Sequence, residues 1–513
     1  MGGVISNYKF YNYHHKFKLL ESLMKDDYIN SNSNNNFNNS LNQNNSMYMN
    51  PHMDNQLNYQ NNSYNQINND YQINNNNQIN NDNQINNNNQ INNDNQINND
   101  NHINNDFYDK ISQKQNNNNK YYNNLKNKYY QNTNYMKNKN NYNNMDKINN
   151  NKYTKFLKTN LGSLEFNNLF INASGCYCQF AEDLDKIYDK NICNGSIISK
   201  TSTLKQRRGN PEPRYFEEHE LQYTFNSMGL PNMGLIYYLE YFKNKCLFFE
   251  NKNIRRPKNH FVSLGGLTLQ ENLDMIDIIY SEEQQYYLYI DAIELNFSCP
   301  NIPGKCQLGY DFDNMNEYLQ QILTKITKTE IQIQYKNNNF TYSNNNDTNN
   351  LTNTNYNNKL QIGIKLPPYF DNYHFQVVSD ILIKYNRLDF ITCINSIGNG
   401  LIIDSVTDSV VIKPKNGLGG LGGSIVKPTS LANVHRFYKL LGDRINIIGC
   451  GGILTGTDAY EHILAGASLL SVGSALMLND EYEFNKIASE LVQIMESKGH
   501  NNINDFKGKL KYL

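Results

Sequence analysis

The segment Asn-Phe-Ser-Cys-Pro-Asn at 296–301 has the clearest capacity for chemistry. A lone cysteine is usually a small core residue, but Cys299 stands among the polar residues Asn296, Ser298 and Asn301. A thiolate in such a loop can take a proton from a substrate carbon. The residues up to Gln307 include Pro, Gly and Lys, which suits a lid that excludes water. We therefore predict that Cys299 is a catalytic base.

Two lysines, Lys200 and Lys365, each end an apolar run. A lysine at the end of a buried strand is costly unless its charge meets an anion, such as a reduced flavin or a carboxylate substrate. Alternatively, either lysine extends along apolar surface to water at the rim of the fold. Asparagines in the neighbouring loops add donors and acceptors for a planar, uncharged ring edge. They are Asn226, Asn296, Asn301 and Asn395.

Glycines follow two further apolar runs, as Gly449-Cys450-Gly451-Gly452 and Gly473-Ser474. Backbone N–H groups without covering side chains form a phosphate cradle, which barrels often build from their last two loops. The plainer interpretation is that Gly-Gly permits a tight turn. The stretch 417–423 is also rich in glycine, and it either closes over the same phosphate or is only a flexible loop.

All these residues follow short apolar runs that read as strands and alternate with helical patterns. Such alternation favours a parallel sheet, and eight units favour a closed (β/α)₈ TIM barrel of the α/β class, whose active sites lie in the loops after the strands. The predicted strands are Asn168–Ala173, Ser196–Lys200, His260–Leu264, Ala292–Phe297, Gln361–Leu366, Phe390–Ile394, Ile445–Ile448 and Leu469–Val472. The predicted helices include Glu271–Tyr280, Asn316–Ile326, Tyr373–Tyr385, Leu431–Leu441 and Asp458–Leu464.

The composition divides the chain of 513 residues into a leader, 1–150, and a globular domain, 151–513. The leader is dominated by Asn and has few apolar residues, so we expect it to be disordered. Within it, Ile recurs every six residues from Ile67 to Ile103; an even period also permits a β-solenoid. A second Asn-rich patch, 336–358, precedes a predicted strand and reads as a surface insertion.

The formal net charge of −1 gives no reason to expect nucleic acid as a partner. No apolar run is long enough to span a bilayer, and no secretory signal is visible. The eight cysteines have no paired metal-ligand spacing, so we expect no metal site and a reducing, cytoplasmic location. The N-terminal sequence from Met1 to Ser6 fits an N-myristoylation pattern at Gly2.

Seven long segments resemble the dihydroorotate dehydrogenases, specifically the soluble, fumarate-using subgroup. The resemblance extends from Leu157 to Leu513 and is most specific in TLKQRRGNPEPRYFE (203–217), NSMGLPNMGLIYYLEY (226–241), ELNFSCPNIPGKCQLGYDF (294–312), GIKLPPYFD (363–371), NSIGNGLIID (395–404), VIKPKNGLGGLGG (411–423) and IIGCGGILTGTDAYEHILAGA (447–467). So many ordered matches are far more specific than any single glycine motif.

This resemblance implies a homodimeric barrel with one FMN per subunit, which oxidises dihydroorotate to orotate and passes the electrons to fumarate, giving succinate. It implies that Cys299 is the base. The implied substrate-binding residues are Lys200, Asn226, Met228, Gly229, Leu230, Asn296, Asn301, Asn395 and Ser396. The implied FMN-binding residues are Ala173, Ser174, Gly175, Lys200, Thr201, Asn296, Lys365, Gly422, Gly451, Gly452, Gly473 and Ser474.

Three positions depart from the family pattern. Cys450 and Ser474 stand where threonine is common, and both keep the backbone N–H donor, so we expect phosphate binding to persist. Cys306 stands where proline is common, which would loosen the lid.

Two alternatives remain at this stage. One is the NAD-linked subgroup with an iron–sulfur partner subunit, and the other is a non-enzymatic assembly protein in which the barrel is a scaffold. The membrane-bound, quinone-using class is disfavoured because its base is a serine and because no anchor precedes the barrel.

Overall fold

The computed structural model describes residues 150–189, 192–298, 307–343 and 359–513, with the backbone alone at 150–152 and 337–343. The leader with its Ile repeat lies outside these residues, as do Cys299, Asn301, Cys306 and the greater part of the predicted insertion. The predictions made for them therefore remain predictions.

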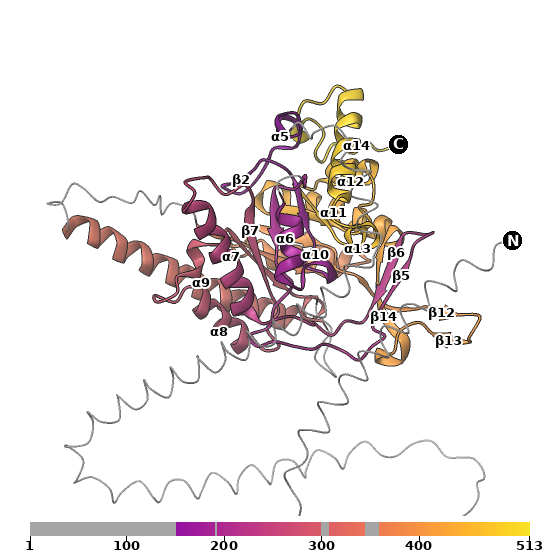
Figure 1. The fold of residues 1–513 in the computed structure, drawn as a ribbon, viewed down its shortest axis with the longest axis horizontal. Coiled ribbons are helices and arrows are strands. Elements are labelled where there is room, and N and C mark those ends of the chain that lie inside the picture. Colours follow the sequence, from indigo (N-terminus) through magenta and orange to yellow (C-terminus); the bar gives the residue numbers. More distant parts are fainter. Residues whose placement is uncertain (1–149, 190–191, 299–306, 344–358) are drawn as a thin grey trace, which may run out of the picture. The chain divides into compact units, whose positions relative to one another are not determined.

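Within the described residues, eight parallel strands form one sheet (Figure 1). Each matches a predicted strand, and adjacent strands in the sheet are also adjacent in chain order, apart from the pairing of the last strand with the first. The predicted TIM barrel is therefore confirmed. The strands are β3 (Phe170–Asn172), β4 (Ser196–Ile198), β7 (Asn259–Leu264), β8 (Ala292–Asn296), β9 (Gln361–Leu366), β10 (Phe390–Cys393), β15 (Asn446–Cys450) and β16 (Leu469–Val472).

The barrel is closed between β3 and β4 by a side chain as well as by backbone. The side-chain amide of Asn172 donates to the carbonyl of Ile198 at 2.8 Å and accepts from the Ile198 N–H at 2.9 Å. It therefore takes the place of the backbone hydrogen bonds between neighbouring strands. The Gly195 N–H also donates to the carbonyl of Phe170 at 3.0 Å. Asn172 is fully buried, and these bonds satisfy a polar group that would otherwise be costly there.

Large apolar side chains fill the lower barrel, and a hairpin covers its N-terminal end. β1 (Thr159–Leu161) and β2 (Leu164–Phe166) pair antiparallel, and their buried residues pack with the interior residues of the strands. Phe390 occupies the interior beside Gly363, where an added Cβ would lie 2.3 Å from its ring. The glycine in β9 therefore makes room for the aromatic ring.

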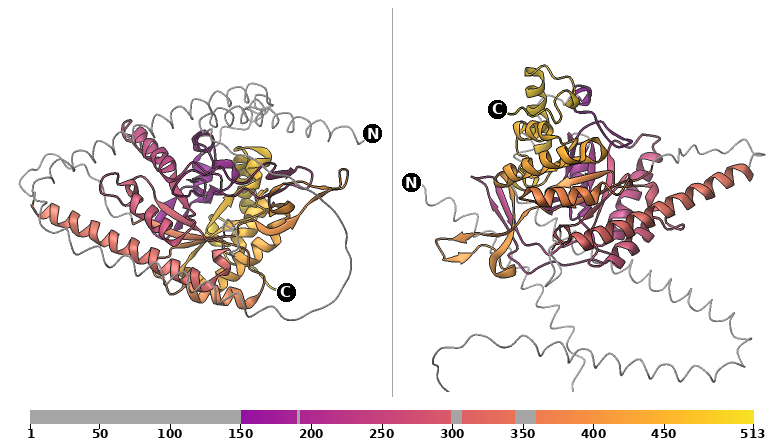
Figure 2. Two further views of the ribbon diagram at one scale, coloured as in Figure 1. Left: turned by 90° about the horizontal axis from the view of Figure 1, so that it is seen from below. Right: turned by 180° about the vertical axis from the view of Figure 1, so that it is seen from behind.

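Helices surround the barrel (Figures 1 and 2). Three of the predicted ones begin at a side-chain cap, which satisfies a free N–H of the first turn: Thr268, Asp371 and Thr455 accept from the third residue beyond. The helices are α5 (Asn150–Leu157), α6 (Ala181–Tyr188), α7 (Leu235–Glu250), α8 (Leu269–Ile279), α9 (Phe312–Ser343), α10 (Asn372–Leu382), α11 (Lys427–Leu441), α12 (Gly456–Ala465), α13 (Ser474–Asn479) and α14 (Glu483–Ser497).

A second, antiparallel sheet was not predicted from the sequence. It has the order β11 (Ile397–Leu401), β14 (Leu418–Gly423), β6 (Tyr223–Asn226) and β5 (Tyr215–Glu218). The alternative that 417–423 is only a flexible loop is therefore wrong, because residues 418–423 form β14, which pairs with β6 and β11 on either side. The small pair β12 (Ile403–Asp404) and β13 (Ser409–Val410) projects beside it (Figure 1).

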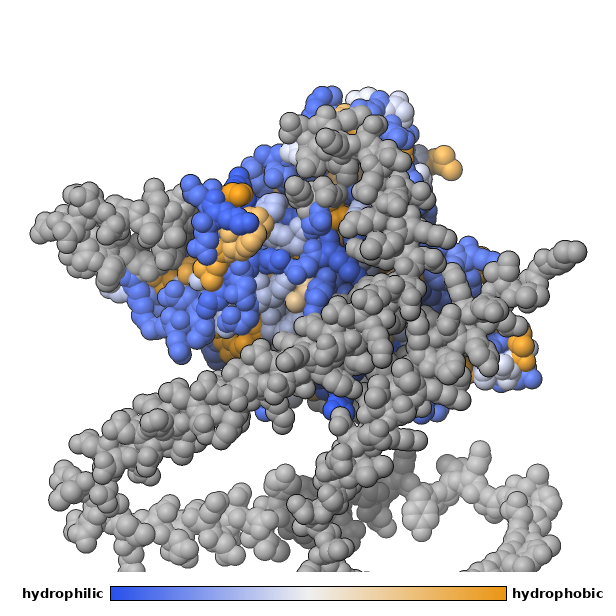
Figure 3. Space-filling model, in the orientation of Figure 1, coloured by the Kyte–Doolittle hydropathy of each residue, from blue (hydrophilic) through white to orange (hydrophobic). Residues whose placement is uncertain are grey.

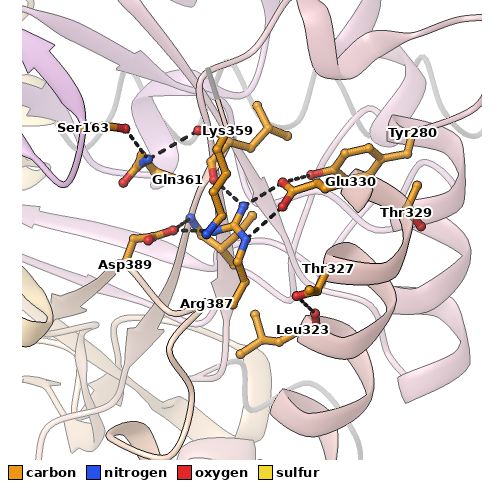
Figure 4. A network of polar contacts seen from close by, with 12 residues as sticks. Ser163, Tyr280, Leu323, Thr327, Thr329, Glu330, Lys359, Gln361, Arg387 and Asp389 are labelled. Carbon is orange, nitrogen blue, oxygen red and sulfur yellow. Dashed lines mark hydrogen bonds and ion pairs between the residues drawn. The ribbon is translucent and has the colours of Figure 1, made fainter. Parts of the chain in front are cut away.

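An ionic network holds α9 to the entry of the barrel strands (Figure 4). The Arg387 guanidinium, 8% exposed, binds Glu330 of α9 at 2.7 Å and Asp389 at 2.5 Å. It also donates to the carbonyl of Leu360 at 2.5 Å, and Tyr280 donates to Glu330 at 2.9 Å. The buried cation is thus surrounded by acceptors, which the desolvation of its charge requires.

The described surface in Figure 3 is largely hydrophilic, with smaller hydrophobic patches between the polar residues. No helix in the described part of the chain is both long and apolar enough to cross a membrane.

Candidate active site

A cleft opens at the carboxyl ends of the barrel strands, beside β6 and β14. The structure brings eleven of the predicted site residues together on its walls. They are Ala173, Gly175, Asn226, Lys365, Asn395, Ser396, Gly422, Gly451, Gly452, Gly473 and Ser474.

Other predicted residues adjoin the cleft without lining it. Asn296 donates to Thr201 at 3.3 Å, accepts from the Ser298 N–H at 3.1 Å and lies 3.5 Å from the amide of Asn395. Asn395 also donates to the hydroxyl of Ser298. These bonds fix the amide of Asn296, at the end of β8, against that of Asn395, two residues beyond β10. The residues that the structure does not describe begin nearby, at Cys299.

Met228, Gly229 and Leu230 follow β6 and do not line the cleft. Leu230 is buried and lies beside the end of β7, where an added Cβ on Gly265 would be 2.7 Å from Thr201 and 3.7 Å from Leu230. Gly229 has a φ of +72°, which favours glycine. This turn therefore stands next to the Thr201–Asn296 pair rather than in the main cleft.

Lys365 reaches the cleft from β9 and is 5% exposed. Its ammonium lies 3.4 Å from the hydroxyl of Ser174, which in turn donates to Glu294 at 2.8 Å. Glu294, on β8, was not identified from the sequence. Its position in an apolar strand was the available signal, because a buried carboxylate needs a specific reason to be there.

Lys200 is also 5% exposed, two residues beyond β4. Among the described residues, no side chain or backbone carbonyl accepts a hydrogen bond from its ammonium. Its positive charge acts to lower the pKa of Cys178, yet burial dominates and raises that pKa to about 12. Cys178 therefore stays a neutral thiol, and the charge of Lys200 remains available to a ligand.

The glycines after β15 and β16 expose backbone donors. In the described part of the chain, nothing accepts from the N–H groups of Gly451, Gly452 and Gly473. Gly451 and Gly452 have φ values of +125° and +74°, and an added Cβ on Gly473 would meet only Ala173, at 3.2 Å. Such uncovered N–H groups are suited to an anion.

Some of the cleft residues that the sequence did not single out come from the second sheet and the first loop. Thr224 of β6 and Ser474 of α13 share a hydrogen bond of 2.7 Å. Tyr177 donates to Glu481, and its pKa is raised by burial, so it is a neutral hydroxyl. Sequence reasoning missed these residues because their positions in the cleft depend on contacts between segments more than 200 residues apart.

The comparison with protein families decides the identity. Residues 156–495 match the family model described as dihydroorotate dehydrogenase. The chain belongs to the dihydroorotate dehydrogenase family. This confirms the resemblance seen in the sequence, and with it the class of enzyme, an oxidoreductase.

Relatives named dihydroorotate dehydrogenase A (fumarate) match most of the barrel. The protein of Lactococcus lactis is 43% identical over 358 residues, 70% of this chain and 100% of its own length. A putative one of Streptococcus agalactiae is 42% identical over 70% of this chain and 99% of its own. The protein from Eimeria tenella crystallised in complex with ferulenol has a TM-score of 0.54 at 21% identity, covering 69% of this chain and 88% of its own, which shows the shared fold.

Proposed function

We propose that this member of the family oxidises (S)-dihydroorotate to orotate in pyrimidine biosynthesis, with FMN as cofactor and fumarate as the electron acceptor. One observation carries the proposal. The cleft joins Lys365, the Asn395-Ser396 pair and the uncovered N–H groups of the last two loops at one end of the barrel. The reaction is the one for which the relatives are named, and the cleft contains groups suited to both FMN and dihydroorotate.

The described residues fit FMN. A phosphate is satisfied by N–H donors that no side chain covers, and Gly451, Gly452 and Gly473 offer three such donors. Lys365, which also lines the cleft, offers a cation to a ring that carries negative charge when reduced. Ala173 and Gly175, on either side of the Ser174 that contacts Lys365, bring no large side chain to the cleft wall. We propose that these residues hold the FMN.

The remaining predicted residues act on the substrate. Asn226, Asn395 and Ser396 on the walls, with Asn296, supply amides and a hydroxyl for the ring edge of dihydroorotate. Cys299 removes the proton from C5, and loss of the C6 hydride leaves the double bond of orotate. Bound FMN supplies the acceptor for that hydride.

The base is tested with two variants at one position. We expect Cys299→Ala to keep FMN and lose nearly all dihydroorotate oxidation, because no group remains to take the proton. Cys299→Ser should keep a small part, mainly at high pH, since a hydroxyl is a much weaker acid than a thiol, whose ordinary pKa is about 8.5. Near-normal flavin reduction by the alanine variant in anaerobic stopped flow removes Cys299 from this role.

The acceptor is tested by comparing fumarate, NAD and a quinone under anaerobic conditions. The proposal expects fumarate to reoxidise the enzyme fastest. Reoxidation by NAD alone would favour the NAD-linked subgroup, and colourless protein that takes up no FMN would favour a scaffold. We also propose that the enzyme is a homodimer, as the resemblance implies, and that it is cytoplasmic, as the cysteine pattern predicts. Sedimentation of the purified enzyme tests the dimer.

A further inference from the structure

A carboxylate, that of Glu294 on β8, lies inside the barrel and does not line the cleft. Glu294 is 4% exposed, and both its oxygens accept hydrogen bonds from hydroxyls. Thr392 of β10 donates to one oxygen at 2.7 Å, while Ser174 and Ser263 bind the other at 2.8 and 3.3 Å. Three donors around a group that only accepts when ionised suit a negative charge. The fold thus maintains a buried carboxylate from three separate strands or loops.

One of these hydroxyls also contacts Lys365. Ser174 can donate only one hydrogen, and it directs that hydrogen to Glu294. The ammonium of Lys365, which is a donor only, must therefore donate to a lone pair of Ser174 at 3.4 Å. The proton order is fixed as ammonium to hydroxyl to carboxylate. Ser174 is the one described residue that accepts from Lys365, so the other two hydrogens of the ammonium remain for the cleft.

We propose that Glu294 is the counter-charge of Lys365, relayed through Ser174, and that it sets the midpoint potential of the bound flavin. Glu294 does not line the cleft and is a positioning residue. Its negative charge attenuates the effect of Lys365 on a reduced, negatively charged ring, while Ser174 holds the ammonium at the cleft. The inference rests on the proposed function, because it requires FMN in this cleft.

The test is a pair of variants that should move the potential in opposite directions. Glu294→Gln keeps the shape and an acceptor for Ser174 but removes the negative charge. We expect the affinity for reduced FMN, relative to oxidised FMN, to rise about tenfold, which for two electrons raises the midpoint potential by about 30 mV. Ser174→Ala keeps the negative charge of Glu294 but removes the hydroxyl that holds the Lys365 ammonium at the cleft. The ammonium can then turn away from the flavin, so the affinity for reduced relative to oxidised FMN should fall.

Thr392→Val is the matched control. It removes a hydrogen bond to Glu294 from the oxygen that does not face Ser174, and it leaves the charge and the relay in place. A role in folding alone would make Thr392→Val and Glu294→Gln behave alike. The counter-charge predicts a raised potential for Glu294→Gln and little change for Thr392→Val.

The measurement is a spectroscopic redox titration of the FMN-loaded, full-length protein, with the FMN content and the unfolding midpoint determined for each variant. An unchanged potential in Glu294→Gln, or equal shifts in that variant and Thr392→Val, overturns the inference while the wild type still binds FMN. If Glu294→Gln does not fold, Ser174→Ala decides alone: a lowered potential supports the relay, and an unchanged or raised one refutes it. A wild type that binds no FMN refutes the proposed function and this inference with it.

Discussion

Gly452→Ala should weaken FMN binding strongly, because the position has no room for a side chain and a shift of its backbone would move the N–H donors of the loop. Gly452 has a φ of +74°, and a residue other than glycine pays about 1–2 kcal/mol in that conformation. An added Cβ would also lie 2.5 Å from the Cβ of Lys427 and 2.8 Å from its Cα, at the start of α11. Overpacking of this kind costs about 1–3 kcal/mol. The total is about 2–5 kcal/mol.

The loop can relieve this strain only by moving, and its N–H donors then leave the phosphate. If the whole cost falls on binding, the Kd for FMN rises by about 30-fold to several thousand-fold. The assay is a titration of the apoprotein with FMN, followed by flavin fluorescence, with urea unfolding of both proteins to measure the part of the cost that falls on folding.

Gly442→Ala is the control. Gly442 has a φ of +59° and nothing within 4 Å of an added Cβ. Its ψ of −141° is also unfavourable for alanine, so the variant should lose about 1–3 kcal/mol of stability from the backbone and still bind FMN as the wild type does. The reasoning is refuted if Gly452→Ala binds FMN within about threefold of the wild type at unchanged stability, a difference of less than about 0.7 kcal/mol.

Three further predictions concern stability and domain organisation. Arg387→Ala leaves Glu330 and Asp389 without their cation and should lower the free energy of unfolding in urea by about 3–5 kcal/mol. The control, Lys336→Ala, breaks an exposed pair with Glu282 and should leave the unfolding midpoint unchanged. Equal effects of the two variants would contradict the argument from burial. Burial, with Glu481 and Glu483 nearby, raises the pKa of Asp480 to about 6, so the folded protein holds that proton more tightly than the unfolded chain, and stability falls as pH rises from about 4 to 6. Asp480→Asn should then be more stable than the wild type at pH 7 and equal to it near pH 4, and a gain of the same size at both pH values would exclude this titration. A chain beginning at Asn150, where α5 starts, should show kcat/KM within tenfold of the full chain; a larger loss would place the leader in the catalytic unit.

The sequence by itself determined the barrel and the position of its active end. A parallel strand inside a barrel is buried on both faces, so it appears as a continuous apolar run that one segment reveals alone. All eight runs became strands. The residues that follow them then had to meet at one end of the barrel, and Lys365, Asn395 and the glycines of the last two loops do so.

Only the tertiary structure determined which residues far apart in the sequence form hydrogen bonds with one another. The stretch 418–423 contains four glycines in six residues, a composition that disfavours a strand; it becomes β14 because β6, some 200 residues earlier, and β11 supply its hydrogen bonds. Glu294 looks like an ordinary polar position in an apolar run until Ser174, Ser263 and Thr392 converge on it. A local sequence pattern indicates whether a segment is buried. Its hydrogen-bond partners depend on which distant segments the closed barrel brings together.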